Sequence, residues 1–213
     1  MRRQHMARRI SILLVAVLAV VTLSSCGAGK VSAPPYQYDA SRYTLCSEIE
    51  GTQFLVPREL DDAKEDMANY SLYDDNELTR HSFEEITENH YYLVKPGTYG
   101  CYAYYVGNID HVEGERDVTR LPSVMGFSSM LSLQLREGES FHTHADAKTG
   151  YIRNTFPVMI HDNAHDLNWY GYLTLLKNPN TGSNYALVDG VAKEDQLNLA
   201  RYFANSFVMV DQD

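Results

Sequence analysis

The chain has 213 residues, with 18 Lys and Arg against 28 Asp and Glu and a formal net charge of −10. This acidic surplus repels phosphate backbones and anionic lipid headgroups, so nucleic acid is not an expected partner. The length allows one domain with a core of its own and is short for the two lobes of a typical solute-binding protein.

The first 25 residues have the order of a secretory signal. Arg2, Arg3, Arg8 and Arg9 form a basic region, and residues 10–23 are almost entirely Ile, Leu, Val and Ala. Fourteen residues suit the apolar region of a signal peptide, whereas a spanning helix needs roughly 20. An uncleaved membrane anchor and an ordinary secretory signal with a chance cysteine are the alternatives.

The end of this run, Leu23-Ser24-Ser25-Cys26, resembles the lipobox of bacterial lipoproteins. The resemblance implies that Cys26 becomes the first mature residue and carries a diacylglyceryl group, with or without a further N-acyl chain. Two acyl chains hold a protein stably on a bilayer, at about 0.8 kcal/mol per buried methylene. The basic region lies on the cytoplasmic side by the positive-inside rule. We therefore expect a lipid-anchored protein on the extracytoplasmic face of the cell membrane, without another cofactor.

The resemblance divides the chain into three parts. Residues 1–25 are the expected signal peptide, residues 26–42 the lipidated cysteine with a flexible tether, and residues 43–213 a single extracytoplasmic domain. The tether is rich in Gly, Ser, Ala and Pro and has no apolar periodicity. Four basic residues leave with the signal, so the 188 mature residues hold 14 basic and 28 acidic side chains, a net charge of −14.

Alternating apolar residues and turn signals predict a series of short strands in the domain. The predicted strands are residues 52–56, 86–94, 98–106, 131–135, 141–144, 151–160, 167–176 and 185–188. Residues 58–69 are polar and compatible with a helix, and residues 107–127 are expected to be a long loop. The segment Pro96-Gly97-Thr98-Tyr99 resembles a hairpin of small Gram-positive extracytoplasmic proteins, in which it is structural.

Residues 193–207 give the strongest helix prediction. Their apolar side chains recur at helical spacing, at Leu197, Ala200, Phe203, Ala204 and Phe207. The sequence therefore predicts an α+β fold, in which an antiparallel sheet is covered by a C-terminal amphipathic helix. This order of elements is similar to that of small α/β/α lipoproteins of the photosystem-extrinsic-protein kind.

Two further residue types bear on structure. If Cys26 is lipidated, Cys46 and Cys101 are the pair left for a disulfide in a compartment that permits one. Two unbridged thiols are the alternative. The chain also has 16 tyrosines, which suit either a wet binding surface or the strands of a sheet.

The sharpest chemical motif is His142-Thr143-His144-Ala145-Asp146. On a strand, period two places His142, His144 and Asp146 on one face, as ligands for zinc or iron. The spacing resembles the His-x-His-x-Asp-His core of metallo-β-lactamase-like hydrolases, but Ala147 replaces the last histidine. A solvated hairpin end is the alternative. A second polar cluster holds His161 and His165, four residues apart, among Asp and Asn residues that favour a loop.

These observations favour a membrane-anchored surface lipoprotein that binds a protein, peptide or glycan of the envelope and is not an enzyme. The strand pattern would form its scaffold, with exposed tyrosines and residues 107–127 as the binding surface. The alternative is a metal-dependent extracytoplasmic enzyme that uses His142, His144 and Asp146. The sequence does not indicate an oligomeric state.

Overall fold

The computed structural model describes residues 36–61, 64–66, 82–86, 90–95, 97–107, 115–124, 131–140, 142–145, 150–163 and 166–210. The chain divides into two units, Met1–Lys30 and Val31–Asp213, and all of these residues belong to the second. The signal, Cys26, Asp146 and His165 lie outside the described residues. No helix in the described segments has the length and apolar character needed to span a membrane.

The described domain is α+β, as the sequence predicts. Its strands are β1 (Tyr43–Cys46), β2 (Thr52–Pro57), β3 (Lys64–Asp66), β4 (Ser82–Ile86), β5 (His90–Lys95), β6 (Tyr99–Gly107), β7 (Leu131–Leu135), β8 (His142–Ala145), β9 (Ile152–Asp162), β10 (Leu167–Lys177), β11 (Asn184–Val191) and β12 (Val208–Met209). Its helices are α1 (Arg58–Asp61), α3 (Glu115–Val124), the 3-10 helix η2 (Glu194–Gln196) and α4 (Leu197–Ser206).

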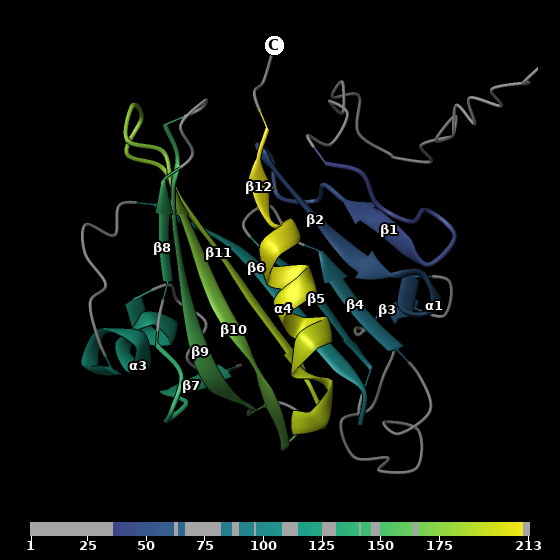
Figure 1. Ribbon diagram of the computed structural model, residues 1–213. Coiled ribbons are helices and arrows are strands. Elements are labelled where there is room, and N and C mark those ends of the chain that lie inside the picture. The colour runs from purple at the N-terminus through teal and green to yellow at the C-terminus, as the bar shows by residue number, and fades with distance from the viewer. Residues whose placement is uncertain are drawn as a thin grey trace, which may run out of the picture. The chain divides into compact units, whose positions relative to one another are not determined.

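Most of the strands form one large sheet (Figure 1). Its nine strands run in the order β3-β4-β5-β6-β11-β10-β9-β7, with β8 paired to β9. All neighbours in it are antiparallel except β3 and β4, which are parallel. A second, three-stranded sheet has the order β1-β2-β12. Antiparallel hairpins suit the short connections that the turn signals predict.

The central strands of the large sheet bury side chains on both faces. In β5, Tyr91 and Leu93 belong to one core cluster, whereas Tyr92 and Val94 belong to another. Because successive side chains of a strand point to opposite faces, the two clusters lie on opposite sides of the sheet. A sheet that is apolar on both faces needs a cover on each.

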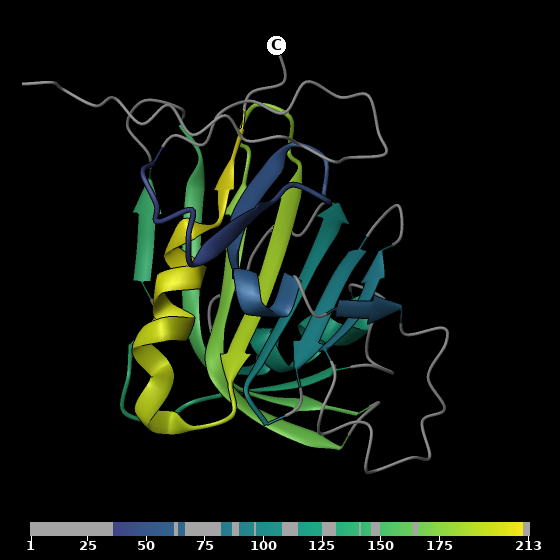
Figure 2. The ribbon, with the colours of Figure 1, turned by 90° about the vertical axis from the view of Figure 1, so that its right-hand side faces the viewer.

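The cover of the first face is α4 together with the small sheet, and Figure 2 shows them on the same side of the large sheet. The predicted helical stripe is confirmed, because Ala200, Phe203, Ala204 and Phe207 are all buried in the first cluster. Leu197 is only partly buried at the edge of that cluster.

The cover of the second face is α3, which packs against the edge strand β7. Val118 and Leu121 of the helix and Leu131 and Leu133 of the strand are buried in the second cluster. The predicted loop over residues 107–127 is therefore wrong for residues 115–124. The helix escapes the sequence analysis because its apolar contact is a single pair of residues, three apart, in a polar stretch that contains Pro122.

Two other expected elements differ from the structure. The helix predicted over residues 58–69 ends at Asp61, and Lys64–Asp66 forms β3 instead. The strand predicted over residues 86–94 corresponds to β5 and to the end of a separate strand, β4. Both differences lie at one edge of the large sheet, where β3 and β4 are too polar to show an alternating apolar pattern.

The packed domain begins before Tyr43, the start that the sequence suggests. Tyr36 and Tyr38, within the predicted tether, pack against the first core cluster. Burial raises the pKa of the Tyr36 hydroxyl well above its usual value. The side chain of Arg58 fastens this segment, because its Nε and Nη2 donate to the Ala40 carbonyl at 3.1 and 2.9 Å.

Tyrosine is the commonest buried aromatic residue of the described domain. Six of its tyrosines are buried, namely Tyr91, Tyr92, Tyr99, Tyr102, Tyr104 and Tyr172, whereas Tyr105 and Tyr202 are exposed. In the described domain, tyrosine serves mainly as a core residue of strands.

Trp169 is the largest fully buried side chain, and it lies over a row of glycines. Gly100, Gly190 and Gly171 are register partners across β6, β11 and β10. A Cβ at Gly190 would lie 2.7 Å from the Trp169 Cβ, and one at Gly100 would lie 3.3 Å from its Cε2. A Cβ at Gly171 would lie 1.8 Å from the Asp189 carbonyl oxygen. The indole fits over Gly190 and Gly100 because these positions lack side chains, whereas Gly171 allows the close approach of the β11 backbone.

We expect Gly171→Ala to lower the free energy of unfolding by about 3 kcal/mol or more, because the obstructing atom belongs to the backbone of the next strand. Gly100→Ala should cost about 1 kcal/mol, because its nearest obstacle, the Tyr102 hydroxyl at 3.0 Å, ends a side chain. Urea unfolding of the two variants measures the difference. An equal loss of unfolding free energy in the two variants would contradict this expectation, because it would mean that β10 and β11 can move apart at Gly171.

Candidate functional site

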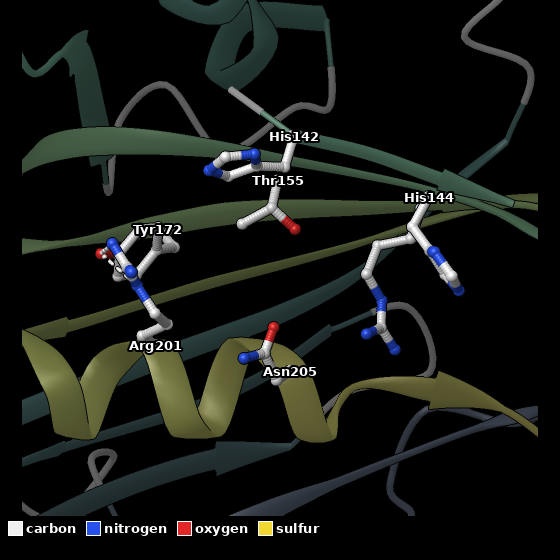
Figure 3. A pocket seen from close by; sticks show the side chains of 7 residues that line it. His142, His144, Thr155, Tyr172, Arg201 and Asn205 are labelled. Carbon is white, nitrogen blue, oxygen red and sulfur yellow. Dashed lines mark hydrogen bonds between the residues drawn. The ribbon is translucent and has the colours of Figure 1, made fainter. Parts of the chain in front are cut away.

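A cleft of about 260 Å³ opens between helix α4 and the strands β8, β9 and β10 (Figure 3). Its lining residues are His142, His144, Arg153, Thr155, Tyr172, Arg201 and Asn205. They come from four elements that span more than 60 positions of the sequence. Polar side chains from several elements converge there around an open space, and we take it as the candidate functional site.

The strand residues of the cleft share a face because of their register. His142 pairs with Thr155 and His144 pairs with Arg153 across β8 and β9. Directly opposed residues of antiparallel strands point to the same side of a sheet, and residues two apart repeat that direction. Tyr172 of β10 is on the same face, as its place in the first core cluster shows.

Helix α4 contributes Arg201 and Asn205, which are four residues apart and therefore neighbours on one helix face. Each follows directly after a buried alanine, Ala200 or Ala204. The alanines turn inward to the core, so the two polar side chains fall beside it, where Figure 3 shows them extending from α4 toward the strands. The amphipathic pattern that packs the helix thus also forms one wall of the cleft.

The Tyr172 hydroxyl is the centre of a hydrogen-bond network. It accepts from Nε and Nη2 of Arg201 at 3.1 and 2.9 Å and from Nη2 of Arg136 at 3.4 Å. It donates to Oε1 of Glu139 at 3.1 Å. The ring itself is buried, so only its polar end reaches the cleft.

Glu139 joins the two arginines. Arg136 and Arg201 both donate to its carboxylate, in short ion pairs. Burial raises the pKa of Glu139, but the hydrogen bond from Arg136 and the charge of Arg201 outweigh that effect, and the net shift is downward. The hydrogen bond to Tyr172 and the charge of Glu139 raise the pKa of Arg201. Glu139 and Arg201 are therefore both charged at neutral pH.

The cleft is positively charged although the protein is acidic. Two of its lining residues, Arg153 and Arg201, are cations, and none of its described lining residues is Asp or Glu. Arg136, behind Tyr172, adds a third guanidinium, and Glu139 forms ion pairs with Arg136 and Arg201. The chain as a whole has a net charge of −10. A local charge opposite to that of the molecule favours anions at this position.

The structure places the predicted metal ligands His142 and His144 in this cleft. Both are exposed on β8, a short strand paired only with β9 among the described strands. Figure 3 shows the imidazole of His142 toward Tyr172 and Arg201, and that of His144 turned the other way. Asp146 is outside the described residues. Within the described residues, no group of three or more His, Cys, Asp and Glu side chains could hold a metal ion.

His161, the described histidine of the second cluster, is not among the lining residues of the cleft. Its neighbour Asp162 has a structural role. Asp162, at the end of β9, is buried and accepts hydrogen bonds from Tyr92 at 2.7 Å and Tyr102 at 3.2 Å. His161 is bound to Asn168 on the neighbouring strand, at 3.1 Å from Nδ1 to Oδ1. From the sequence, Asp162 is expected to be a turn residue. The structure instead shows it as the buried acceptor of two tyrosine hydroxyls.

Cys46 and Cys101 are both buried in the first core cluster. The structure describes them as separate thiols, and their pairing stays a prediction. Burial, with a smaller effect of Cys46, raises the pKa of the Cys101 thiol well above its usual value. Such a thiol is a poor nucleophile at neutral pH. Neither cysteine is among the described lining residues of the cleft.

Asp189 is an uncompensated acid in the first core. Its side chain is fully buried on β11, opposite Cys101 and near Tyr99. Apart from its own backbone N–H, which has a small lowering effect, neither carboxyl oxygen has a hydrogen-bond partner among the described residues. Burial raises the pKa of Asp189 well above its usual value. The folded protein therefore keeps a proton there that the unfolded chain releases above about pH 4.

Because the native state binds the extra proton, the contribution of Asp189 to the free energy of unfolding falls as pH rises from about 4 toward the raised pKa. Each pH unit in that window costs about 1.4 kcal/mol. We expect Asp189→Asn to gain stability relative to the parent as pH rises from 4 to 7. Urea unfolding at several pH values measures this. A pH-independent difference between the two proteins would mean that the carboxyl group is not held protonated.

The sequence and the structure were each compared with those of known proteins. No protein-family model matches the chain, and no curated protein matches it. Among solved structures, the chain is similar to the Ran-binding protein Mog1p of Saccharomyces cerevisiae, with a TM-score of 0.39 and 10% sequence identity. That alignment covers 79% of this chain and 96% of Mog1p.

Proposed function

We propose that this protein is a lipid-anchored extracytoplasmic binding protein, whose cleft beside α4 binds a ligand of the cell envelope. The main support for a binding role is the cleft itself. Its seven lining residues include five hydrogen-bonding side chains other than the two arginines, and they converge from four elements on a space of about 260 Å³. Sites for small molecules are concave and have a few such convergent polar groups.

The anchored location is supported by the order of basic residues, apolar run and small residues before Cys26. With two acyl chains on Cys26, the domain would stay at the membrane without a spanning helix.

Cys26→Ser should abolish labelling by a fatty-acid probe and move the protein from the membrane to the soluble fraction, because Ser has no thiol to carry the lipid. Metabolic labelling and fractionation of cells measure both effects. Cys46→Ala is the control, since it keeps the lipobox and should be labelled like the parent. A Cys26→Ser protein that is still acylated would contradict the proposed anchor.

The alternative function is a metal-dependent enzyme with His142, His144 and Asp146 as ligands. The observation in its favour is that His142 and His144 line the same cleft. Two imidazoles and one carboxylate suit zinc or non-haem iron.

Metal analysis of the full chain, purified in neutral detergent, separates the two functions. The binding protein should contain less than one tenth of an equivalent of zinc or iron, with no change in the double variant His142→Gln, His144→Gln. Stoichiometric metal that the double variant loses would instead favour the enzyme, because a metal held by these ligands cannot survive their removal.

A further inference from the structure

We propose that the ligand of the cleft is a small oxyanion, which carries a carboxylate or a phosphate group on a body no larger than a single sugar. This inference rests on the proposed binding function and specifies its ligand class. Three features of the cleft support an oxyanion ligand. They are the sign of its charge, the hydrogen bonds that hold Arg201, and the hydrogen-bonding side chains near Arg201.

The charge of the cleft selects for anions and against metal cations. Arg153 and Arg201 both line it, and its described lining holds no carboxylate. Arg201 is paired with Glu139, and Arg153 donates to the Phe207 carbonyl, but both guanidinium groups still line the cleft. In a partly enclosed site, such groups attract an oxyanion more strongly than they would in open water and repel a divalent cation. The acidic remainder of the protein, with its net charge of −10, leaves this cleft as a local positive site.

Arg201 is held in place before a ligand arrives. Its Nε and Nη2 are occupied by the Tyr172 hydroxyl and by Glu139. No hydrogen bond joins its Nη1 to another residue in the described segments, and its side chain is 51% exposed. A guanidinium that is fixed along one edge loses little freedom when the remaining donors bind a carboxylate or phosphate. Tyr172 and Glu139 are therefore positioning residues for Arg201.

The hydrogen-bonding groups around Arg201 complete a site for an oxyanion with a polar body. His142 is directed toward Arg201 and Tyr172, and Asn205 extends from the next turn of α4 (Figure 3). The Thr155 hydroxyl lies across from them on β9. An imidazole, an amide and a hydroxyl can each bind oxygen atoms of the ligand. A cleft of about 260 Å³ limits that ligand to a molecule of roughly one sugar or one small dicarboxylate.

The test is calorimetric titration of the full chain, purified in neutral detergent at low salt. The probes are inorganic phosphate, glucose 6-phosphate, citrate and, as the neutral partner, glucose. We expect saturable binding of at least one organic anion and at least tenfold weaker binding of glucose than of glucose 6-phosphate. Glucose 6-phosphate against citrate distinguishes a phosphate from a carboxylate ligand, and both results support an oxyanion site.

Two matched pairs of variants locate the site. Asn205→Asp adds a negative charge to the cleft without changing the size of the side chain, and Asn180→Asp adds the same charge in the exposed loop after β10. Arg201→Gln removes a cation from the cleft, and Arg120→Gln removes one from the exposed side of α3. Asn205→Asp and Arg201→Gln should each weaken anion binding at least tenfold, whereas the controls should change it less than twofold.

Binding that is equal for glucose and glucose 6-phosphate would overturn the proposal, as would binding that Asn205→Asp leaves unchanged. Absence of saturable binding by every anion probe would overturn it too. Asn205 is exposed and outside the Tyr172 network, so its variant stays informative even if Arg201→Gln is unstable. Acylation of Cys26 is measured separately, so failure of the oxyanion proposal and failure of the proposed anchor are distinguishable.

Discussion

The central strands β5, β6, β10 and β11 bury apolar side chains on both faces, and this constraint determines the rest of the domain. An antiparallel sheet of this kind cannot leave either face in water without exposing a row of Tyr, Leu and Val side chains. Helix α4 with the small sheet covers one face, and α3, packed against the edge strand β7, covers the other. Gly190 and Gly100 serve the same requirement, since they leave room for the buried indole of Trp169 over β11 and β6.

The cleft is a consequence of how the first face is covered. α4 packs through its alanines and phenylalanines, so the polar residues on its flank are held next to the strands. Tyr172 joins the core to the cleft, because its ring is buried among apolar residues while its hydroxyl binds Arg201 and Glu139. The guanidinium of Arg201 therefore owes its fixed position to a core side chain, which makes the site stiff as well as charged.

The two buried aspartates, Asp162 and Asp189, differ in the hydrogen bonds that their carboxyl groups receive. Asp162 receives two hydrogen bonds from tyrosine hydroxyls on the second face of the sheet. Asp189 receives none from another described residue on the first face, and burial raises its pKa. A carboxyl group without partners in a core is destabilising. Asp189 therefore reduces the stability of the part of the domain that carries the cleft.

The sequence by itself determined the features that depend on local pattern. Alternation predicts most strands of the large sheet, the apolar stripe predicts α4, and the order of residues before Cys26 predicts a lipid anchor. Tertiary structure alone decided the helix α3, the split between β4 and β5, and the convergence of Arg153, Tyr172 and Arg201. Arginines on separate elements carry no local signal of a shared site, because their proximity depends on strand register and helix packing. The sequence singled out His142 and His144, which lie on a strand that borders the cleft. The arginines that give the cleft its charge could be grouped only from the tertiary structure.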